Sequence, residues 1–236
     1  MKILITTFAI LFSFLTLNSQ SLIGAWEANG DIRGKKVRSV VIFSDNHQVG
    51  TFYDAETGAF MGTNGGSWSL EDKTITEVIE FDTENPARVG QTNTFEIDVS
   101  DDELKIQGAP LVWKRIDNGT PGELDGAWLI SGRKVDGEMR SMDTTRPRKT
   151  MKILSGTRFQ WIAYNTETKE FMGTGGGTYT TENGKYIENI EFFSRDDSRV
   201  GATLEFDYEL KNGDWHHSGL SSKGQPIYEV WSKRLP

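Results

Sequence analysis

The chain has 236 residues, of which 34 are acidic and 26 are Lys or Arg, so its formal net charge is −8. This balance argues against nucleic acid as a partner, because a nucleic-acid site needs a strong basic patch. The chain has no cysteine and three histidines, which excludes disulfides, thiolate chemistry and cysteine–zinc sites; we expect neither a metal nor a cofactor.

The first twenty residues differ from the rest of the chain. Lys2 is followed by an apolar run from Ile3 to Leu17, which has the length of a signal-peptide core and is short for a membrane span. Small and polar residues follow, so we expect cleavage between Ser19 and Ser21. Residues 1–20 therefore predict an exported protein, periplasmic or secreted, without a stable membrane anchor; an uncleaved anchor is the alternative.

A duplication covers most of the remaining chain. Residues 55–68 (AETGAFMGTNGGSW) return as residues 166–179 (TETKEFMGTGGGTY), 111 positions later. At this offset residues 42–108 align without a gap with residues 153–219, and 22 of the 67 aligned pairs are identical. Similarity at a fixed period over this length indicates two copies of one structural unit.

The copies are separated by a short segment of turn-forming residues, 117–122 (DNGTPG), which predicts a linker. We therefore expect a first repeat over residues 21–116 and a second over residues 123–236. The second copy carries nine additional residues after its first strand and seven in its last loop.

Both copies have the pattern of strands. Apolar and acidic residues alternate strictly from Leu204 to Leu210, and turn clusters such as residues 181–185 and 211–214 follow at hairpin spacing. The triple glycine at 175–177 precedes no helix, so we interpret it as a bulge or tight turn. The pattern predicts an all-β fold of two tandem antiparallel barrels or sandwiches.

Each copy opens with the same tripeptide, Gly24-Ala25-Trp26 and Gly126-Ala127-Trp128, which resembles the Gly-x-Trp opening of lipocalin-like (calycin) barrels. In that family a basic residue near the last strand packs on this tryptophan. The resemblance implies this role for Arg115 in the first copy and for Lys233 or Arg234 in the second.

Each copy serves as a control for the other, because packing residues should recur whereas a site can occur once. Strand alternation places the core-facing side chains of the first copy, and the second copy changes three apolar ones to polar ones. The exchanges are Ile75 to Tyr186, Ile97 to Tyr208, and Ile106 to His217. Buried polar tips are costly unless they bond to one another or to a ligand.

The second repeat therefore predicts a polar pocket with aromatic walls, and the first a packed scaffold. The pocket should contain seven side chains: Trp161, Tyr179, Tyr186, Glu188, Tyr208, Trp215 and His217. His216, one position away, should point outward.

Less specific readings stay open for several of these residues. Glu77 and Glu188 occur in both copies, so a structural ion pair with the basic residue near the last strand is an alternative to catalysis. His217 and the tryptophans have a core-packing alternative, and Arg199, which pairs with Arg88, has a loop-anchoring one.

Such a pocket suits a sugar, because flat rings stack on pyranose faces while polar groups bond the hydroxyls. For a uronate it would support β-elimination: Arg199 or Lys223 would neutralise the carboxylate, and His217 or a tyrosinate would remove the C5 hydrogen. Tyr186 or Tyr208 would protonate the departing oxygen, and Glu188 would orient His217.

The segment from Trp215 to Gly224 and the Gly-x-Trp repeats resemble secreted lipocalin-like proteins of polysaccharide-degrading bacteria. The resemblance implies a dehydratase acting on the uronic-acid ends of ulvan oligosaccharides. We thus expect an exported carbon–oxygen lyase for an acidic oligosaccharide, and keep as alternative a non-catalytic binding protein for a sugar or small apolar ligand. The sequence leaves open whether the protein is a homodimer.

Overall fold

The computed structural model of the protein describes residues 22–32, 34–120, 122–221 and 223–235. The predicted signal peptide, residues 1–20, lies outside the described residues. Among the residues described, no helix is long and apolar enough to cross a membrane.

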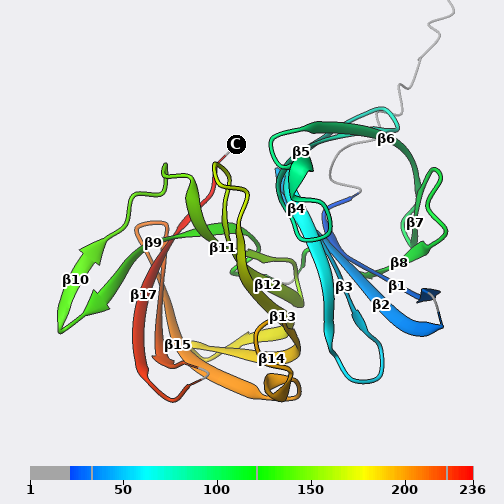
Figure 1. Cartoon of the computed structure of the whole chain (residues 1–236). Helices are drawn as coiled ribbons and strands as arrows, with labels where there is room; N and C mark the ends of the chain where they lie inside the picture. Colours follow the sequence, from blue (N-terminus) through cyan, green and yellow to red (C-terminus); the bar gives the residue numbers. More distant parts are fainter. Residues whose placement is uncertain (1–21, 33, 121, 222, 236) are drawn as a thin grey trace, which may run out of the picture.

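The first copy of the repeat is a closed antiparallel barrel of eight strands, drawn in blue to green in Figure 1. Each strand pairs with the next one along the chain, and the last pairs with the first. The strands are β1 (Gly24–Ile32), β2 (Lys35–Phe43), β3 (His47–Asp54), β4 (Phe60–Glu71), β5 (Thr74–Asp82), β6 (Thr92–Val99), β7 (Glu103–Ile106) and β8 (Val112–Asp117).

The second copy closes in the same way, because β17 pairs with β9, and it carries β10 as an additional strand beside β9. Its strands are β9 (Gly126–Val135), β10 (Glu138–Ser141), β11 (Arg148–Leu154), β12 (Arg158–Asn165), β13 (Phe171–Glu182), β14 (Lys185–Phe193), β15 (Thr203–Lys211), β16 (Asp214–Leu220) and β17 (Pro226–Lys233). The predicted all-β fold of two tandem antiparallel repeats is confirmed, and the repeats are barrels.

Local sequence explains the hairpins. Asp136-Gly137, Asn183-Gly184 and Asn212-Gly213 all have positive φ at both positions, from 52° to 87°. Two such residues form the tight turn whose twist matches that of the flanking strands. The sequence therefore fixes β9–β10, β13–β14 and β15–β16 as hairpins.

The glycine bulge predicted at residues 175–177 is confirmed, and the first barrel has the same bulge. The register of β13 against β14 shifts between Gly176 and Gly177, and that of β4 against β5 shifts between Gly65 and Gly66. A Cβ atom on Gly176 would lie 2.6 Å from the carbonyl oxygen of Phe159, so the backbones approach too closely for a side chain there.

The basic residues expected from the lipocalin-like resemblance cover their tryptophans. The Arg115 guanidinium lies 3.9 Å from the ring centroid of Trp26, and the Lys233 ammonium lies 5.9 Å from that of Trp128. Both indoles are buried and donate to the carbonyl four residues earlier, of Leu22 and Leu124. In both barrels a basic residue of the last strand therefore covers the buried tryptophan of the first strand.

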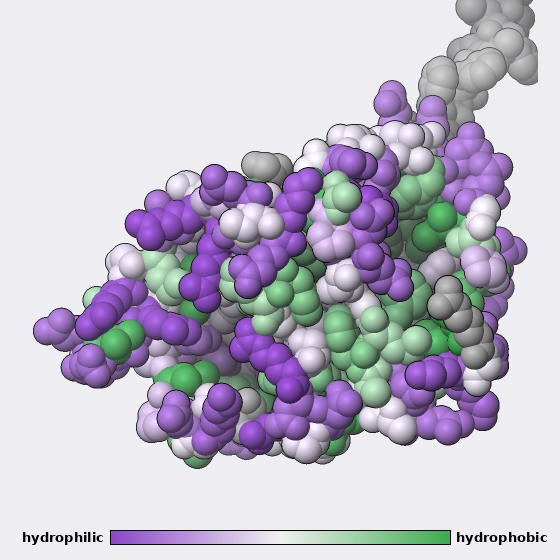
Figure 2. All heavy atoms as spheres, viewed as in Figure 1, coloured by the Kyte–Doolittle hydropathy of each residue, from purple (hydrophilic) through white to green (hydrophobic). Residues whose placement is uncertain are grey.

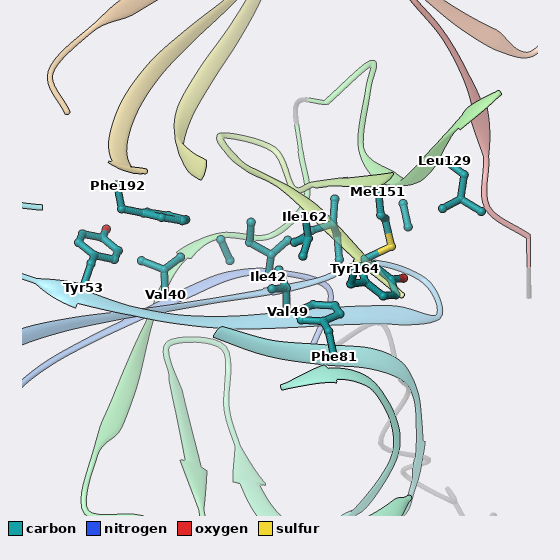
Figure 3. Close-up of a cluster of buried hydrophobic side chains, with 13 residues drawn as sticks. Val40, Ile42, Val49, Tyr53, Phe81, Leu129, Met151, Ile162, Tyr164 and Phe192 are labelled. Atoms are coloured by element: carbon teal, nitrogen blue, oxygen red, sulfur yellow. The ribbon is translucent and has the colours of Figure 1, made fainter. Parts of the chain in front are cut away.

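The barrels pack side by side through a shared apolar cluster, shown in Figure 3. In that view Tyr53 of β3 faces Phe192 of β14, and Phe81 of β5 lies beside Tyr164 of β12. Their ring centroids are 5.0 Å and 4.8 Å apart. Since Tyr53 corresponds to Tyr164 and Phe81 to Phe192, each barrel presents the same patch to the other.

Hydrogen bonds across this interface also join equivalent residues of the two barrels. The Tyr53 hydroxyl donates to Glu191 over 2.8 Å, and the Tyr164 hydroxyl donates to Glu80, which is the counterpart of Glu191 in the repeat. Arg234 also binds Glu80, with 2.6 Å between Nη2 and Oε1. The interface is thus reciprocal, like that of a two-fold symmetric dimer.

Asp117, the first residue of the predicted linker, forms hydrogen bonds between the two barrels. Asp117 is the last residue of β8, and its carboxylate accepts hydrogen bonds from three successive residues that follow β11, namely Ser155, Gly156 and Thr157. The connection between the barrels, residues 118–125, is therefore tied to the second barrel at its start.

Candidate functional site

The interior of the second barrel contains a cavity of about 340 Å³, here called the second-barrel cavity. It reaches the barrel end where the β14–β15 and β16–β17 loops lie, because Arg195 and Ser221 from these loops line it. Half of its fourteen lining residues are polar or charged: Thr150, Lys152, Glu188, Arg195, His217, Ser221 and Glu229. A barrel interior with this composition is not a packed apolar core.

A buried ion pair forms one part of the cavity wall. Lys152 of β11 and Glu188 of β14 are 2.8 Å apart from Nζ to Oε1, and each side chain is 6% exposed. The ammonium also lies 4.9 Å from the ring centroids of Tyr186 and Trp215. Aromatic faces attract a desolvated cation, so these rings and the carboxylate together hold the charge inside the barrel.

His217 of β16 lies next to this pair. The side chain is 2% exposed, and neither ring nitrogen has a hydrogen-bond partner among the described residues. Its Nδ1 lies 3.6 Å from Oε2 of Glu229, just beyond hydrogen-bond distance. Burial and the nearby Lys152 ammonium lower the pKa of His217. The cavity therefore contains a neutral imidazole with an unused donor and an unused acceptor.

An aromatic wall faces these polar groups. The rings of Trp161 and Phe193 meet edge to face with 5.5 Å between their centroids. The Arg195 guanidinium lies 6.0 Å from the Trp161 ring and donates to the carbonyl oxygen of Met172. A Cβ atom on Gly175 would lie 2.7 Å from the Trp161 indole nitrogen, so this glycine makes room for the ring.

The first barrel keeps the glutamate of this polar arrangement but not its lysine or its histidine. Glu77 occupies the place of Glu188, but Val41 replaces Lys152 and Ile106 replaces His217. Without an adjacent lysine, burial raises the pKa of Glu77 to about 7. The ion pair and the imidazole therefore belong to the second copy alone among the described residues.

Three of the predicted site residues line the cavity: Trp161, Glu188 and His217. Tyr186 and Trp215 are fully buried and pack behind these residues in the same cluster. Burial and the neighbouring Glu188 carboxylate raise the pKa of Tyr186 well above its ordinary value. The alternation argument thus gives the inward face of β14 and β16 correctly.

Two other predicted residues, Tyr179 and Tyr208, do not line the cavity. Both line a separate depression formed with the segment that precedes β9. Tyr179 donates to the carbonyl oxygen of Ser155 over 2.5 Å, and Tyr208 donates to the Glu123 carboxylate. Both hydroxyls therefore have protein partners where the structure places them.

The two predicted carboxylate-binding cations do not line the cavity either. Arg199 lies in the short turn Asp197–Arg199 and pairs with Asp196 at 3.3 Å, whereas Lys223 is exposed in the β16–β17 loop. Arg88 likewise pairs with Asp82 at 2.7 Å. These distances favour the loop-anchoring interpretation of the repeated arginine.

Sequence reasoning missed Lys152, Arg195 and Glu229 as lining residues. The alternative of an ion pair for Glu188 named the basic residue near the last strand as its partner, but Lys233 covers Trp128 and the partner is Lys152. A signal existed for Lys152, which is a lysine inside the apolar run Met151–Leu154 and aligns with Val41. Arg195 lies in the β14–β15 loop and Glu229 lies inside β17, and neither position carries such a signal.

The fold and the cavity define the class of protein: two eight-stranded antiparallel barrels in tandem, consistent with a tandem lipocalin-like fold, with a polar cavity in the second barrel. No protein-family model matches the chain, and no curated protein sequence matches it. Within the described parts of the chain, no group of three or more His, Cys, Asp or Glu side chains is arranged to hold a metal ion.

Proposed function

We propose that the second-barrel cavity binds the uronate end of an acidic oligosaccharide and catalyses a β-elimination there. The observation that carries this proposal is His217, a buried neutral imidazole without a hydrogen-bond partner at a position where the packed barrel has Ile106. An imidazole in this state can accept a proton from a bound molecule.

The lining supports a sugar with a carboxylate. Trp161 offers a flat face for a pyranose ring. The Arg195 guanidinium beside it can bind a carboxylate through two parallel hydrogen bonds. Arg195 takes over the role that the sequence suggested for Arg199 or Lys223, because it lines the cavity. Neutralising the carboxylate makes the neighbouring C5 hydrogen more acidic.

In the proposed reaction His217 removes the C5 proton of the uronate. The electron pair of that C–H bond forms the C4–C5 double bond, and the C4–oxygen bond breaks. The Lys152 ammonium gives a proton to the departing oxygen, which leaves as water from a chain end. Glu229 stabilises the imidazolium that forms, at 3.6 Å from Nδ1, and Glu188 stays beside Lys152.

The expected substrate source, ulvan oligosaccharides, and the expected exported location are part of this proposal. They derive from the resemblance to proteins of polysaccharide-degrading bacteria and from residues 1–20.

Binding without catalysis is the second candidate function. It is favoured by the Lys152–Glu188 contact of 2.8 Å, because an ammonium held by a carboxylate is a poorer proton donor. In this case the same residues would hold a sugar or a small apolar ligand through Trp161, Phe193 and Arg195.

The test incubates the protein with uronate oligosaccharides and follows the ultraviolet absorbance of the unsaturated acid. We expect turnover with the wild type, and a loss of about 10²-fold or more in His217→Asn, which matches the usual size of acid–base catalysis. The matched control is His216→Asn, since His216 faces outward and bonds the Tyr228 hydroxyl over 2.9 Å.

Ligand binding without any rise in absorbance would leave the binding function and reject the enzyme. Equal losses in both histidine variants would reject His217 as the base. Failure of every uronate to bind or react would reject the proposal as a whole.

A further inference from the structure

A second hollow adjoins the cavity on the side of the β9–β10 hairpin. It has a volume of about 440 Å³ and lies between β9, β11 and the segment that joins β10 to β11. We call it the hairpin groove. Thr150 lines both the groove and the second-barrel cavity, so the two hollows meet at this residue.

The groove is cationic in a protein that is acidic overall. Segment 133–149, which forms the hairpin and the following loop, contains six Lys or Arg residues and three Asp or Glu residues, against a net charge of −8 for the chain. Four of the six cations line the groove: Arg133, Arg146, Arg148 and Lys149. Figure 2 shows mostly hydrophilic residues over this projecting hairpin, at the left of the view.

Backbone contacts organise part of the groove. Lys149 donates from Nζ to the carbonyl oxygens of Thr144 at 2.8 Å and Arg146 at 2.9 Å, so it holds the loop against β11. The Arg146 side chain is 76% exposed and lies 3.6 Å from Asp143. Arg146 and the exposed Arg148 can therefore turn toward a ligand without breaking a buried contact.

A charged contact links the groove to the proposed base. Arg133 lies 3.4 Å from Oε1 of Glu229, whose other oxygen lies 3.6 Å from Nδ1 of His217. An anion in the groove and a sugar at His217 would thus lie on either side of the same carboxylate.

The first barrel has no counterpart of this groove in its sequence. In the first barrel β1 ends at Ile32 and β2 begins at Lys35, whereas the second copy inserts nine residues after its first strand. The insertion therefore accompanies the polar cavity in the same barrel.

We propose that the hairpin groove binds a second anionic group, a carboxylate or a sulfate, on the sugar next to the one held in the cavity. The inference depends on the proposed function, because it assigns the protein an oligosaccharide rather than a single uronate. Two or more guanidinium groups converging on one anionic group give charge-assisted hydrogen bonds that a monosaccharide cannot use.

The test compares three probes by calorimetric titration: glucuronic acid, a glucuronate-containing tetrasaccharide, and the sulfated form of that tetrasaccharide. We expect at least one tetrasaccharide to bind about tenfold or more tightly than glucuronic acid, since one charge-assisted contact is worth roughly that factor. The variant Arg146→Ala/Arg148→Ala should remove this gain and leave glucuronic acid unchanged.

The matched control is Lys134→Ala/Arg140→Ala. It also removes two positive charges from the hairpin, but at positions that do not line the groove. It should keep the gain. A larger gain for the sulfated probe identifies sulfate as the second anion, and an equal gain identifies a carboxylate.

Equal affinity for glucuronic acid and both tetrasaccharides would overturn the groove proposal and leave the proposed function standing. Equal losses in the two double variants would overturn it as well, because the gain would then reflect overall charge. If none of the three probes binds, both proposals fall.

Discussion

Glu77 and Glu188 occupy the same place in the two barrels, but only Glu188 has a lysine beside it. In the first barrel the position of Lys152 is taken by Val41, and burial raises the pKa of Glu77 to about 7. In the second barrel the carboxylate and the ammonium are 2.8 Å apart. The same position thus holds a carboxyl group with a pKa near neutrality in the first barrel and one half of a buried ion pair in the second.

The two copies share the residues that form and join the barrels and differ in side chains that line the interior. Trp26 and Trp128, the glycine bulges and the interface tyrosines recur, whereas Lys152, Trp161 and His217 occur in one copy. Substitutions that give one barrel the residues of the other therefore test which contents matter.

The largest effect is expected when Lys152 is replaced by the residue of the first barrel. Lys152→Val leaves Glu188 buried and unpaired, which should lower the free energy of unfolding by about 3–5 kcal/mol at pH 8. The loss should be smaller at pH 5, where the carboxyl group can take up a proton. Denaturant titration measures both values.

The double variant Lys152→Val/Glu188→Gln is the control, because it removes both charges and should recover part of the loss. If Lys152→Val unfolds at the wild-type denaturant concentration, the ion pair contributes nothing to stability.

The second effect concerns Glu77 and pH. Its pKa rises from 4.5 in the unfolded chain to about 7 in the folded protein, so the folded state holds more protons between these values. The stabilisation is fully present below pH 4.5 and is lost as pH rises through about 7, a change of about 3 kcal/mol. Glu77→Gln should remove this slope, which unfolding measured from pH 4 to pH 8 would reveal as a flatter profile.

A smaller effect should test the reciprocal interface. Tyr53→Phe and Tyr164→Phe each remove a hydrogen bond to a carboxylate of the other barrel, and each should cost about 1.5–2 kcal/mol. Thermal or denaturant unfolding should give similar losses for the two. A loss in only one variant would mean that the two halves of the interface are not energetically equivalent.

The smallest effect is expected for His217→Ile, which copies Ile106. It removes two buried nitrogens without hydrogen-bond partners and should stabilise the protein by about 1 kcal/mol. Because burial lowers the pKa of His217, the unfolded chain binds a proton below pH 6.5 that the folded protein does not. The gain should therefore be larger at pH 5 than at pH 8, and a destabilised variant would show that the imidazole is satisfied after all.

The fold could be predicted because the duplication and the period-two alternation can both be read directly from the order of residues along the chain. The offset of 111 residues placed His217 opposite Ile106, and alternation placed it inside the barrel. The bulge at Gly176 followed from the run of glycines, whereas the basic residue over Trp128 followed from the lipocalin-like resemblance, which left Lys233 and Arg234 as alternatives.

The site could be predicted only in part, because contacts across a barrel depend on its diameter and shear rather than on sequence spacing. Glu188 meets Lys152 from three strands away, and no pattern along the chain encodes that distance. Tyr208 lies directly opposite His217 on the neighbouring strand, but its hydroxyl donates to Glu123, in the segment that precedes β9.

The reciprocal contact between the barrels has a consequence for how the copies could diverge. In a dimer of identical chains every substitution occurs twice, so a polar cavity would destabilise both subunits. Association of the subunits would also depend on protein concentration. Here a connection of residues 118–125, with Asp117 bonded to the second barrel, keeps the partner at a high effective concentration. One barrel can then remain a well-packed support while the other accepts an imperfect interior.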